Sequence, residues 1–368
     1  MTQNHTIKQP LVRIVKRDSM KVTKAWGIRL LALLASLIVC AILIFAITKL
    51  NPLKVYSTMF TGAFGTPRRS WQTIRDTMML LCISIGLAPA FMMRFWNCGA
   101  EGQILVGGVA TAACMIYLGD KLPTPVLFLV MIAASILSGA VWGFVPAIFK
   151  AYFNTNETLF TLMMNYIAIQ TTSYFVAKWE KPFGSNSVGI INPTNNEGWL
   201  PSLFGMQYGW NVVIVLALTV VMYFYLKNSK QGYEIAVVGE SENTARYAGI
   251  NVKRVIMRTM ILSGAVCGLS GFLAVSGASH TISTSTAGGR GFTAIIVAWL
   301  SKFNTFVMVL FSLLLAFLEK GAGEIASKFN LNDYASEMIE GIILFFVLGS
   351  EFFINYRLIF RGHNDHAE

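Results

Sequence analysis

Residues 97–103, Asn97-Cys98-Gly99-Ala100-Glu101-Gly102-Gln103, form a polar, glycine-rich segment between two long apolar runs. A carboxylate inside an apolar span costs about 2.5–3.5 kcal/mol on insertion scales. Glycine lets the backbone bend and lets a neighbouring helix or a solute approach closely. Lipid does not tolerate such a segment, so protein must surround it. The segment is therefore either a functional site or a tight junction between helices.

The composition of the chain is that of an integral membrane protein. Its 368 residues are 55% hydrophobic and only 13% charged, whereas soluble domains carry about 25% charged residues. The mean hydropathy is +0.58. The five cysteines lie in or beside apolar runs without the spacing of a metal site or a disulfide framework, so we expect free thiols.

Several apolar runs are long enough, or nearly long enough, to cross a membrane. A helix needs about 20 apolar residues to span roughly 30 Å of hydrocarbon. The sequence therefore predicts an all-α, polytopic membrane protein with about ten transmembrane helices. The predicted spans are 27–47, 75–93, 101–118, 124–149, 157–178, 209–226, 256–278, 286–301, 303–320 and 334–354. The run 286–301 is short and rich in glycine at its start, so one helix is expected to be short or broken.

The distribution of basic residues predicts the orientation of the chain. Seven lysines and arginines lie between Lys8 and Arg29, ahead of the first apolar run, against Asp18 alone, and such a flank marks a cytoplasmic N-terminus. We expect a basic cytoplasmic arm over 1–26, a transmembrane domain over 27–354 and a cytoplasmic tail over 355–368, in a multi-pass protein of the cell membrane. The loop after the first span is also basic, which an interfacial helix would explain.

The loop over 228–255 is predicted to be cytoplasmic and to contain a short amphipathic helix. Ser241 or Asn243 can cap the start of this helix, and Gly249 can end it in the left-handed conformation. A short helix held between two spans on the inner face is a natural docking element for a cytoplasmic partner.

Two further segments carry polar residues into apolar surroundings. Glu157, Thr161 and Asn165 share one face of the span 157–178, and such a stripe lines either a solute pathway or a contact between helices. The Ser/Thr/Gly run from Ser279 to Gly291 includes Arg290 and precedes an apolar run. Broken, glycine-rich helix starts are where transporters place substrate sites. The topology puts this run near the outer face and residues 97–103 near the inner face.

Other patterns limit the chemistry of the chain. No Gly-x4-Gly-Lys-[Ser/Thr] phosphate loop is present, and neither is a His-Glu-x-x-His or Cys-x-x-Cys pair, so we expect no ATP site of that kind and no metal. His280 is predicted to be an interfacial residue at the end of a span. Gly139-x-x-x-Gly143 and Gly264-x-x-x-Gly268 predict close packing of helices.

Three segments together resemble the permease subunits of ATP-binding-cassette (ABC) importers, in the superfamily that handles branched-chain amino acids, ribose and nucleosides. They are 97–103, Asn156-Glu157 with Leu162-Met163-Met164-Asn165-Tyr166-Ile167-Ala168, and Gly232-Tyr233-Glu234 through Gly239-Glu240 to Ala245-Arg246-Tyr247-Ala248-Gly249-Ile250. The run from Gly291 to Ala298 is similar to a further segment of that family. The motif Ala-Glu-Gly-Gln, together with Met-x-Asn-Tyr, looks closest to the longer permease of nucleoside uptake systems. Cys98 departs from that pattern, because the family more often has an aliphatic residue at this position.

The resemblance implies a subunit that takes up nucleosides and is not itself an enzyme. It implies a cytoplasmic ABC ATPase subunit that binds and hydrolyses ATP, a second, homologous permease and an extracellular substrate-binding lipoprotein. Membrane lipid surrounds such a chain, and neither a cofactor of its own nor a nucleic-acid partner is expected. The predicted substrate-pathway residues are Asn97, Glu101, Gln103, Glu157, Asn165, Tyr166 and Arg290. The predicted ATPase-coupling residues are Gly239, Glu240, Ala245, Arg246 and Gly249.

Alternatives remain open at this point. A ribose-type sugar or a branched-chain amino acid is an alternative cargo. A membrane-embedded enzyme would use Glu101 and Arg290 as a catalytic pair, and it predicts activity from the purified chain alone. A channel predicts flux without ATP.

Overall fold

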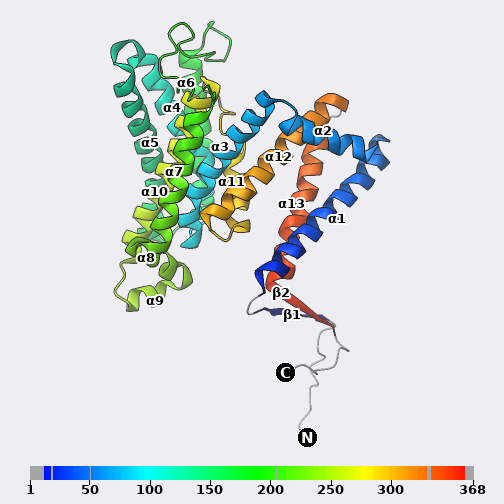
Figure 1. Cartoon of the computed structure of the whole chain (residues 1–368). Helices are drawn as coiled ribbons and strands as arrows, with labels where there is room; N and C mark the ends of the chain where they lie inside the picture. Colours follow the sequence, from blue (N-terminus) through cyan, green and yellow to red (C-terminus); the bar gives the residue numbers. More distant parts are fainter. Residues whose placement is uncertain (1–11, 18–19, 50, 204, 330–332, 361–368) are drawn as a thin grey trace. The chain divides into compact units, whose positions relative to one another are not determined.

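The computed structural model describes residues 12–17, 20–49, 51–203, 205–329 and 333–360, which are almost entirely helical (Figure 1). Its elements are, in chain order, β1 (Val12–Lys16), α1 (Val22–Thr48), α2 (Pro52–Phe64), α3 (Pro67–Met92), α4 (Ala100–Leu118), η1 (Gly119–Lys121), α5 (Thr124–Phe153), α6 (Glu157–Trp179), α7 (Gly209–Asn228), α8 (Lys230–Glu240), α9 (Glu242–Tyr247), α10 (Val252–Ala274), η2 (Val275–Ser279), α11 (Arg290–Leu300), α12 (Thr305–Phe329), α13 (Asp333–Asn355) and β2 (Tyr356–Phe360). They form two compact units. Unit 1 contains the described residues up to Ala63 and from Leu318 onward, and unit 2 runs from Phe64 to Phe317.

Each predicted span lies on a helix, in agreement with an all-α, polytopic membrane protein. Within the described residues, seven helices are long and apolar enough to cross a membrane: α1, α3, α4, α5, α7, α10 and α12. The helix α11 has only 11 residues and begins at Arg290, so the run 286–301 does contain a short helix. The number of crossings, about ten, stays a prediction.

Nothing in the sequence pattern predicts the two-stranded antiparallel ribbon formed by β1 and β2. Val12 lies opposite Phe360, and Lys16 lies opposite Tyr356. Both strands are rich in β-branched or aromatic residues, which favour this conformation. The strands come from opposite ends of the chain, however, and no local pattern reveals a pairing of that kind.

Unit 1 is held together by contacts between the first and the last helices. α1 packs along α13, and Arg29 Nε donates to Glu351 Oε1 at 2.8 Å. α2 lies against the C-terminal part of α12, where a side chain at Gly321 would collide with Met59. A helix is therefore present where the sequence predicts an interfacial helix after the first span.

Small residues let the central helices of unit 2 approach one another backbone to backbone. α10 crosses α5 where Gly139 and Gly143 face Gly264 and Gly268. A Cβ atom at Gly143 would lie 2.6 Å from the carbonyl oxygen of Met260, and one at Gly264 would overlap the carbonyl oxygen of Gly139. The two predicted small-residue pairs thus pack against each other, which confirms their role in helix packing.

α10 joins the two ends of unit 2. Its 23 residues make it about 35 Å long at 1.5 Å per residue. It starts beside α8 and α9 and continues at its other end into η2 (Figure 1). At that second end the loop after α6 docks on the chain: the Leu200 N–H donates to the Ser276 carbonyl at 3.0 Å, and the rings of Trp199 and His280 stack with centroids 3.9 Å apart.

Candidate functional site

The polar segment after α3 is a buried junction between helices. Asn97 is fully buried and its side-chain amide donates to Ser263 Oγ at 3.0 Å. Its Oδ1 accepts the Gly99 N–H at 3.1 Å and a bond from Gln103 Nε2 at 3.3 Å. Asn97 and Gln103 therefore satisfy the backbone and side-chain polar groups of a non-helical turn inside the protein.

The polar stripe of α6 closes the same junction from the other side. Asn165 Oδ1 accepts the Gly102 N–H at 2.9 Å, and Asn165 Nδ2 donates to the Cys98 carbonyl at 2.8 Å. Thr161 Oγ1 accepts the Cys98 N–H at 3.2 Å. Of the two interpretations left open for this stripe, the structure therefore favours a contact between helices.

Two other residues predicted for the pathway lie outside this network. Glu157 forms an ion pair with Lys150 at 2.9 Å, which joins the start of α6 to the end of α5. Tyr166 is 64% exposed on the outer side of α6. The structure therefore does not bring Glu157 and Tyr166 together with Glu101 or Arg290.

Glu101 joins α4 to the start of α11. Its carboxylate accepts the Gly289 N–H at 2.7 Å and the Gly291 N–H at 2.9 Å. Unpaired N–H groups and the helix dipole make a helix N-terminus a favourable place for a carboxylate. Glu101 thus caps α11 from a different helix.

This contact corrects two expectations. Residues 97–103 and the run 279–291 do not lie at opposite faces, because the run turns back from the end of η2 towards the start of α4 and places Gly289 and Gly291 on Glu101. Glu101 and Arg290 do not form the pair that the enzyme hypothesis needs, since Arg290 Nη2 instead lies 3.3 Å from Asp76 Oδ1. That hypothesis has no geometric basis at this site.

Replacing Glu101 with alanine is expected to lower the free energy of unfolding by about 1–2 kcal/mol, because two N–H groups at the start of α11, one exposed and one part-buried, lose a charged acceptor. The measurement is unfolding of the purified chain in detergent, together with hydrogen exchange at Gly289 and Gly291. Glu240→Ala is the matched control: Glu240 is exposed, and its loss should change stability by about 0.5 kcal/mol at most. Equal stability and equal exchange in both variants would contradict the capping role.

A polar cavity of about 230 Å³ lies at the η2 end of unit 2. Three charged residues, Arg75, Asp76 and Arg290, line it together with hydroxyl groups of the run 279–291. The other lining residues are Met79, Ala274, Ala278, Ser279, Thr281, Ser283, Ser285 and Thr286. The broken helix start therefore borders a cavity, as expected where a transporter places a solute.

Sequence reasoning missed Arg75 and Asp76, although a signal was available. Both stand at the start of the predicted span 75–93, and ionisable residues within a span point to function or to a partner inside the protein. Arg75 donates to Asp76 Oδ1 from Nε at 2.9 Å and approaches it with Nη2 at 2.8 Å. The guanidinium of Arg75 also lies over the ring of Tyr208, 5.3 Å from its centroid.

The opposite end of unit 2 carries the two helices of the loop 228–255. Ser241 Oγ accepts the Thr244 N–H at 3.3 Å and so caps α9, and Gly249 has a φ of +76°. These observations confirm two predictions about the loop. Ser241, one of the two candidate capping residues, caps the helix, and Gly249 adopts the left-handed conformation. The additional helix α8, capped by Ser229, precedes α9.

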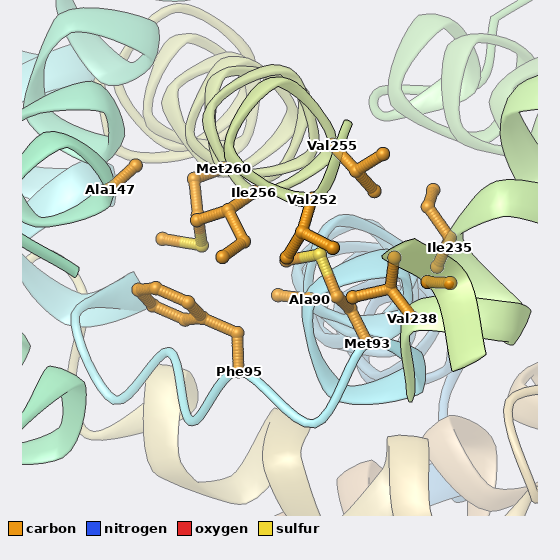
Figure 2. Packing of buried hydrophobic residues seen from close by; sticks show 11 residues of the cluster. Ala90, Met93, Phe95, Ala147, Ile235, Val238, Val252, Val255, Ile256 and Met260 are labelled. Carbon is orange, nitrogen blue, oxygen red and sulfur yellow. The ribbon is translucent and has the colours of Figure 1, made fainter. Parts of the chain in front are cut away.

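α8 and α9 are fixed to the body of unit 2. Figure 2 shows the buried apolar cluster beneath them, in which Met93 after α3 lies beside Val238 of α8 and Val252 of α10, and the ring of Phe95 lies on the side of Met260. Ala245 is fully buried in the same cluster.

A Cβ at Gly239 would overlap the carbonyl oxygen of Met92, so α8 touches the end of α3. Glu240 and Arg246 point outward and are exposed, and Tyr247 beside them is 93% exposed. Of the predicted coupling residues, Gly239 and Ala245 therefore hold the helices in place, while Glu240 and Arg246 belong to the free surface of the α8–α9 end.

The apolar helices and the buried polar junction define a multi-pass membrane protein. The chain belongs to the family described as branched-chain amino acid transport system / permease component, whose model matches residues 71–348. The resemblance inferred from the three sequence segments is thereby confirmed.

Relatives with named functions cover most of the chain. The guanosine ABC transporter permease protein NupP of Bacillus subtilis is 30% identical over 305 residues, 80% of this chain and 85% of the relative. The glucose ABC transporter permease protein TsgB13 of Haloferax volcanii is 26% identical over 345 residues, 91% of this chain and 90% of the relative. The nucleoside ABC transporter permease protein NupB of Lactococcus lactis subsp. cremoris is 24% identical over 306 residues, 81% and 84% of the two chains.

Proposed function

We propose that this chain is the permease subunit of an ATP-driven ABC importer that takes up nucleosides. The observation that carries the proposal is the arrangement of unit 2, with a polar cavity at one end and a docked helix pair at the other. Two of the three relatives are named for guanosine or nucleoside transport. Ribose-type sugars and branched-chain amino acids are the alternative cargoes.

The basic residues around α8 and α9 indicate which end of unit 2 faces the cytoplasm. Lys227, Lys230, Arg246, Lys253 and Arg254 cluster at that end, which by the positive-inside rule faces the cytoplasm together with both termini. The cavity at the η2 end then faces outward, where an extracellular binding protein delivers the solute. A cytoplasmic ATPase subunit binds ATP and docks on the exposed side of α9, and a second, homologous permease completes the transport path.

The packing of unit 2 supplies a route for movement between these ends. α8 and α9 share one apolar cluster with the end of α3 and the start of α10. Both long helices also reach the cavity, through Arg75, Asp76 and Met79 of α3 and Ala274 of α10. A rigid-body displacement of the α8–α9 end by the ATPase therefore moves helices that form the cavity wall, as alternating access requires.

Reconstitution tests the proposal. The chain is placed in proteoliposomes with its ATPase, second permease and binding protein, and the uptake of guanosine, ribose, leucine and glucose is measured with and without ATP. We expect ATP-dependent uptake of guanosine, lost when the ATPase is omitted. Uptake that persists without the ATPase would indicate a channel, and ATP-dependent uptake of ribose, leucine or glucose alone would assign the alternative cargo.

A further inference from the structure

The helix α8 is attached to three neighbouring helices by contacts of two kinds. At its start, a Cβ atom at Gly232 would overlap the backbone at the end of α7, and at its end Gly239 lies in the same way against the end of α3. Between these glycines, Glu234 faces α10 and forms an ion pair with Arg258. At these three points α8 therefore meets α7 and α3 through the backbone but α10 through charged side chains.

The ion pair has a defined geometry. Arg258 Nη2 donates to Glu234 Oε2 at 2.5 Å and to the Gln231 carbonyl oxygen, one turn earlier in α8, at 3.5 Å. The Gln231 side chain in turn accepts a bond from the Tyr225 hydroxyl of α7 at 2.8 Å. The side chains of Arg258 and Glu234 are only 31% and 15% exposed, so salt screens their attraction less than on a free surface. One guanidinium therefore joins α10 to two points on α8.

The two kinds of contact transmit movement differently. The close glycine contacts resist compression because atoms cannot overlap, and the attraction within the apolar cluster beneath α8 is non-directional. A charge-assisted hydrogen bond has both a preferred distance and a preferred direction. It therefore resists separation and sliding as well as compression. Of the three attachments, the pair of Glu234 and Arg258 is the one that fixes the register of α8 on α10.

The position of Arg258 on α10 connects this attachment to the cavity. Arg258 lies in the second turn of α10, counted from Val252, and Ala274 at the other end of the same helix lines the cavity. The helix between Arg258 and Ala274 is about 24 Å long at 1.5 Å per residue. Between them α10 is held against α5 at Gly264 and Gly268. A displacement of Arg258 therefore tilts α10 about this crossing and moves Ala274.

We propose that Arg258 is a positioning residue of transport, whose ion pair with Glu234 passes the displacement of α8 on to α10 and so to the cavity. This inference rests on the proposed ATP-driven transport, whatever the cargo. The exposed surface around Arg246 and Tyr247 contains neither residue of the pair, so the ATPase subunit still docks and hydrolyses ATP when the pair is broken. Without the pair α8 moves without α10, and hydrolysis continues without movement of the solute.

The number of solute molecules taken up per ATP hydrolysed tests this role. The full chain is reconstituted in proteoliposomes with its ATPase, second permease and binding protein, and the uptake of labelled guanosine, ribose, leucine and glucose is measured together with phosphate release. We expect Arg258→Gln and Glu234→Gln each to lower the ratio about tenfold or more, the factor that corresponds to loss of a charged hydrogen bond, while hydrolysis continues. Glu234→Arg combined with Arg258→Glu restores the pair in reverse and should recover most of the ratio.

Lys150→Gln is the matched control. Lys150 pairs with Glu157 at 2.9 Å, with side chains 22% and 15% exposed. This pair lies at the same end of unit 2, where Lys253 of α10 lies over the Tyr152 ring of α5, but it joins α5 to α6 instead of α8 to α10. Lys150→Gln should lower the thermal stability of the purified chain as Arg258→Gln does and leave the ratio of uptake to hydrolysis unchanged.

Each other outcome has a definite meaning. An unchanged ratio in Arg258→Gln and Glu234→Gln would show that α8 moves α10 through other contacts. Loss of hydrolysis together with uptake, an equal fall of the ratio in Lys150→Gln, or a folded double variant that stays uncoupled would reduce the pair to a structural role. Failure of both single variants to fold would do the same. If the unaltered transporter took up none of the four solutes with ATP, the proposed function itself would fail.

Discussion

The substitution Gly264→Leu is expected to prevent unit 2 from folding. Even the first side-chain atom at this position would overlap the carbonyl oxygen of Gly139, and Gly143 lies directly beside it. Neither neighbour can move aside as a flexible side chain would, since both contacts are made by the backbone of α5. Overpacking a core typically costs about 1–3 kcal/mol, and more where the backbone must shift. We therefore expect Gly264→Ala to lower the free energy of unfolding strongly and Gly264→Leu to yield no folded protein.

The yield of monodisperse protein in detergent and its thermal unfolding measure this effect. Gly349→Ala is the matched control, because Gly349 is also helical but, among the described residues, nothing beyond its own helix backbone lies within 4 Å of its added Cβ. Alanine is favoured over glycine in a helix by about 1 kcal/mol, so the control should be neutral or stabilising. Folding of Gly264→Leu at the yield of the unaltered chain would show that α5 and α10 do not cross as described.

The second large effect is expected from Ala245→Trp, which should abolish ATP-coupled uptake while the chain still inserts into the membrane. Ala245 is fully buried in the cluster between α9 and the body of unit 2. A tryptophan there has no space, so α9 must lift away from α8 and α10. The long helices do not depend on this contact, which is why insertion should survive. Uptake in proteoliposomes and hydrogen exchange of the α9 amides are the two measurements.

Ala248→Trp adds the same bulk on the exposed side of the same turn and serves as the control for α9. Its α9 amides should keep their protection, whereas those of Ala245→Trp should lose it. If Ala245→Trp transported nucleosides at the unaltered rate, α9 would not transmit the action of the ATPase, and the assignment of this end would have to be withdrawn.

Local patterns in the sequence predicted most of the helices and the short helix α9. Apolar runs located the helices, and Ser241 and Gly249 marked the start and the end of α9, because caps and left-handed glycines depend on neighbouring residues alone. The small-residue pairs likewise indicated a close helix crossing. Such features can be recognised without knowledge of the fold.

The arrangement of the polar residues could not be predicted in the same way. Asn97, Gln103 and Asn165 looked like pathway residues, but whether an amide faces a solute or a neighbouring backbone depends on the packing of α4 against α6. The bond from Gly289 to Glu101 joins residues far apart in the chain. The pairing of Asp76 with Arg290 likewise depends on the run 279–291 turning back from the end of η2 towards α3.

The two units also differ in when they can be completed during synthesis. Unit 2 is one continuous stretch of chain, from Phe64 to Phe317, so all of its helices are available before the last part of the chain has been made. Unit 1 contains segments from before and after unit 2, so α1 must wait for α13, and β1 for β2, until the segment that follows unit 2 has been made. Since chains begin to fold from the N-terminal side as they emerge, a ribosome stalled after α11 would present a nearly complete unit 2 beside an α1 that still lacks its partner.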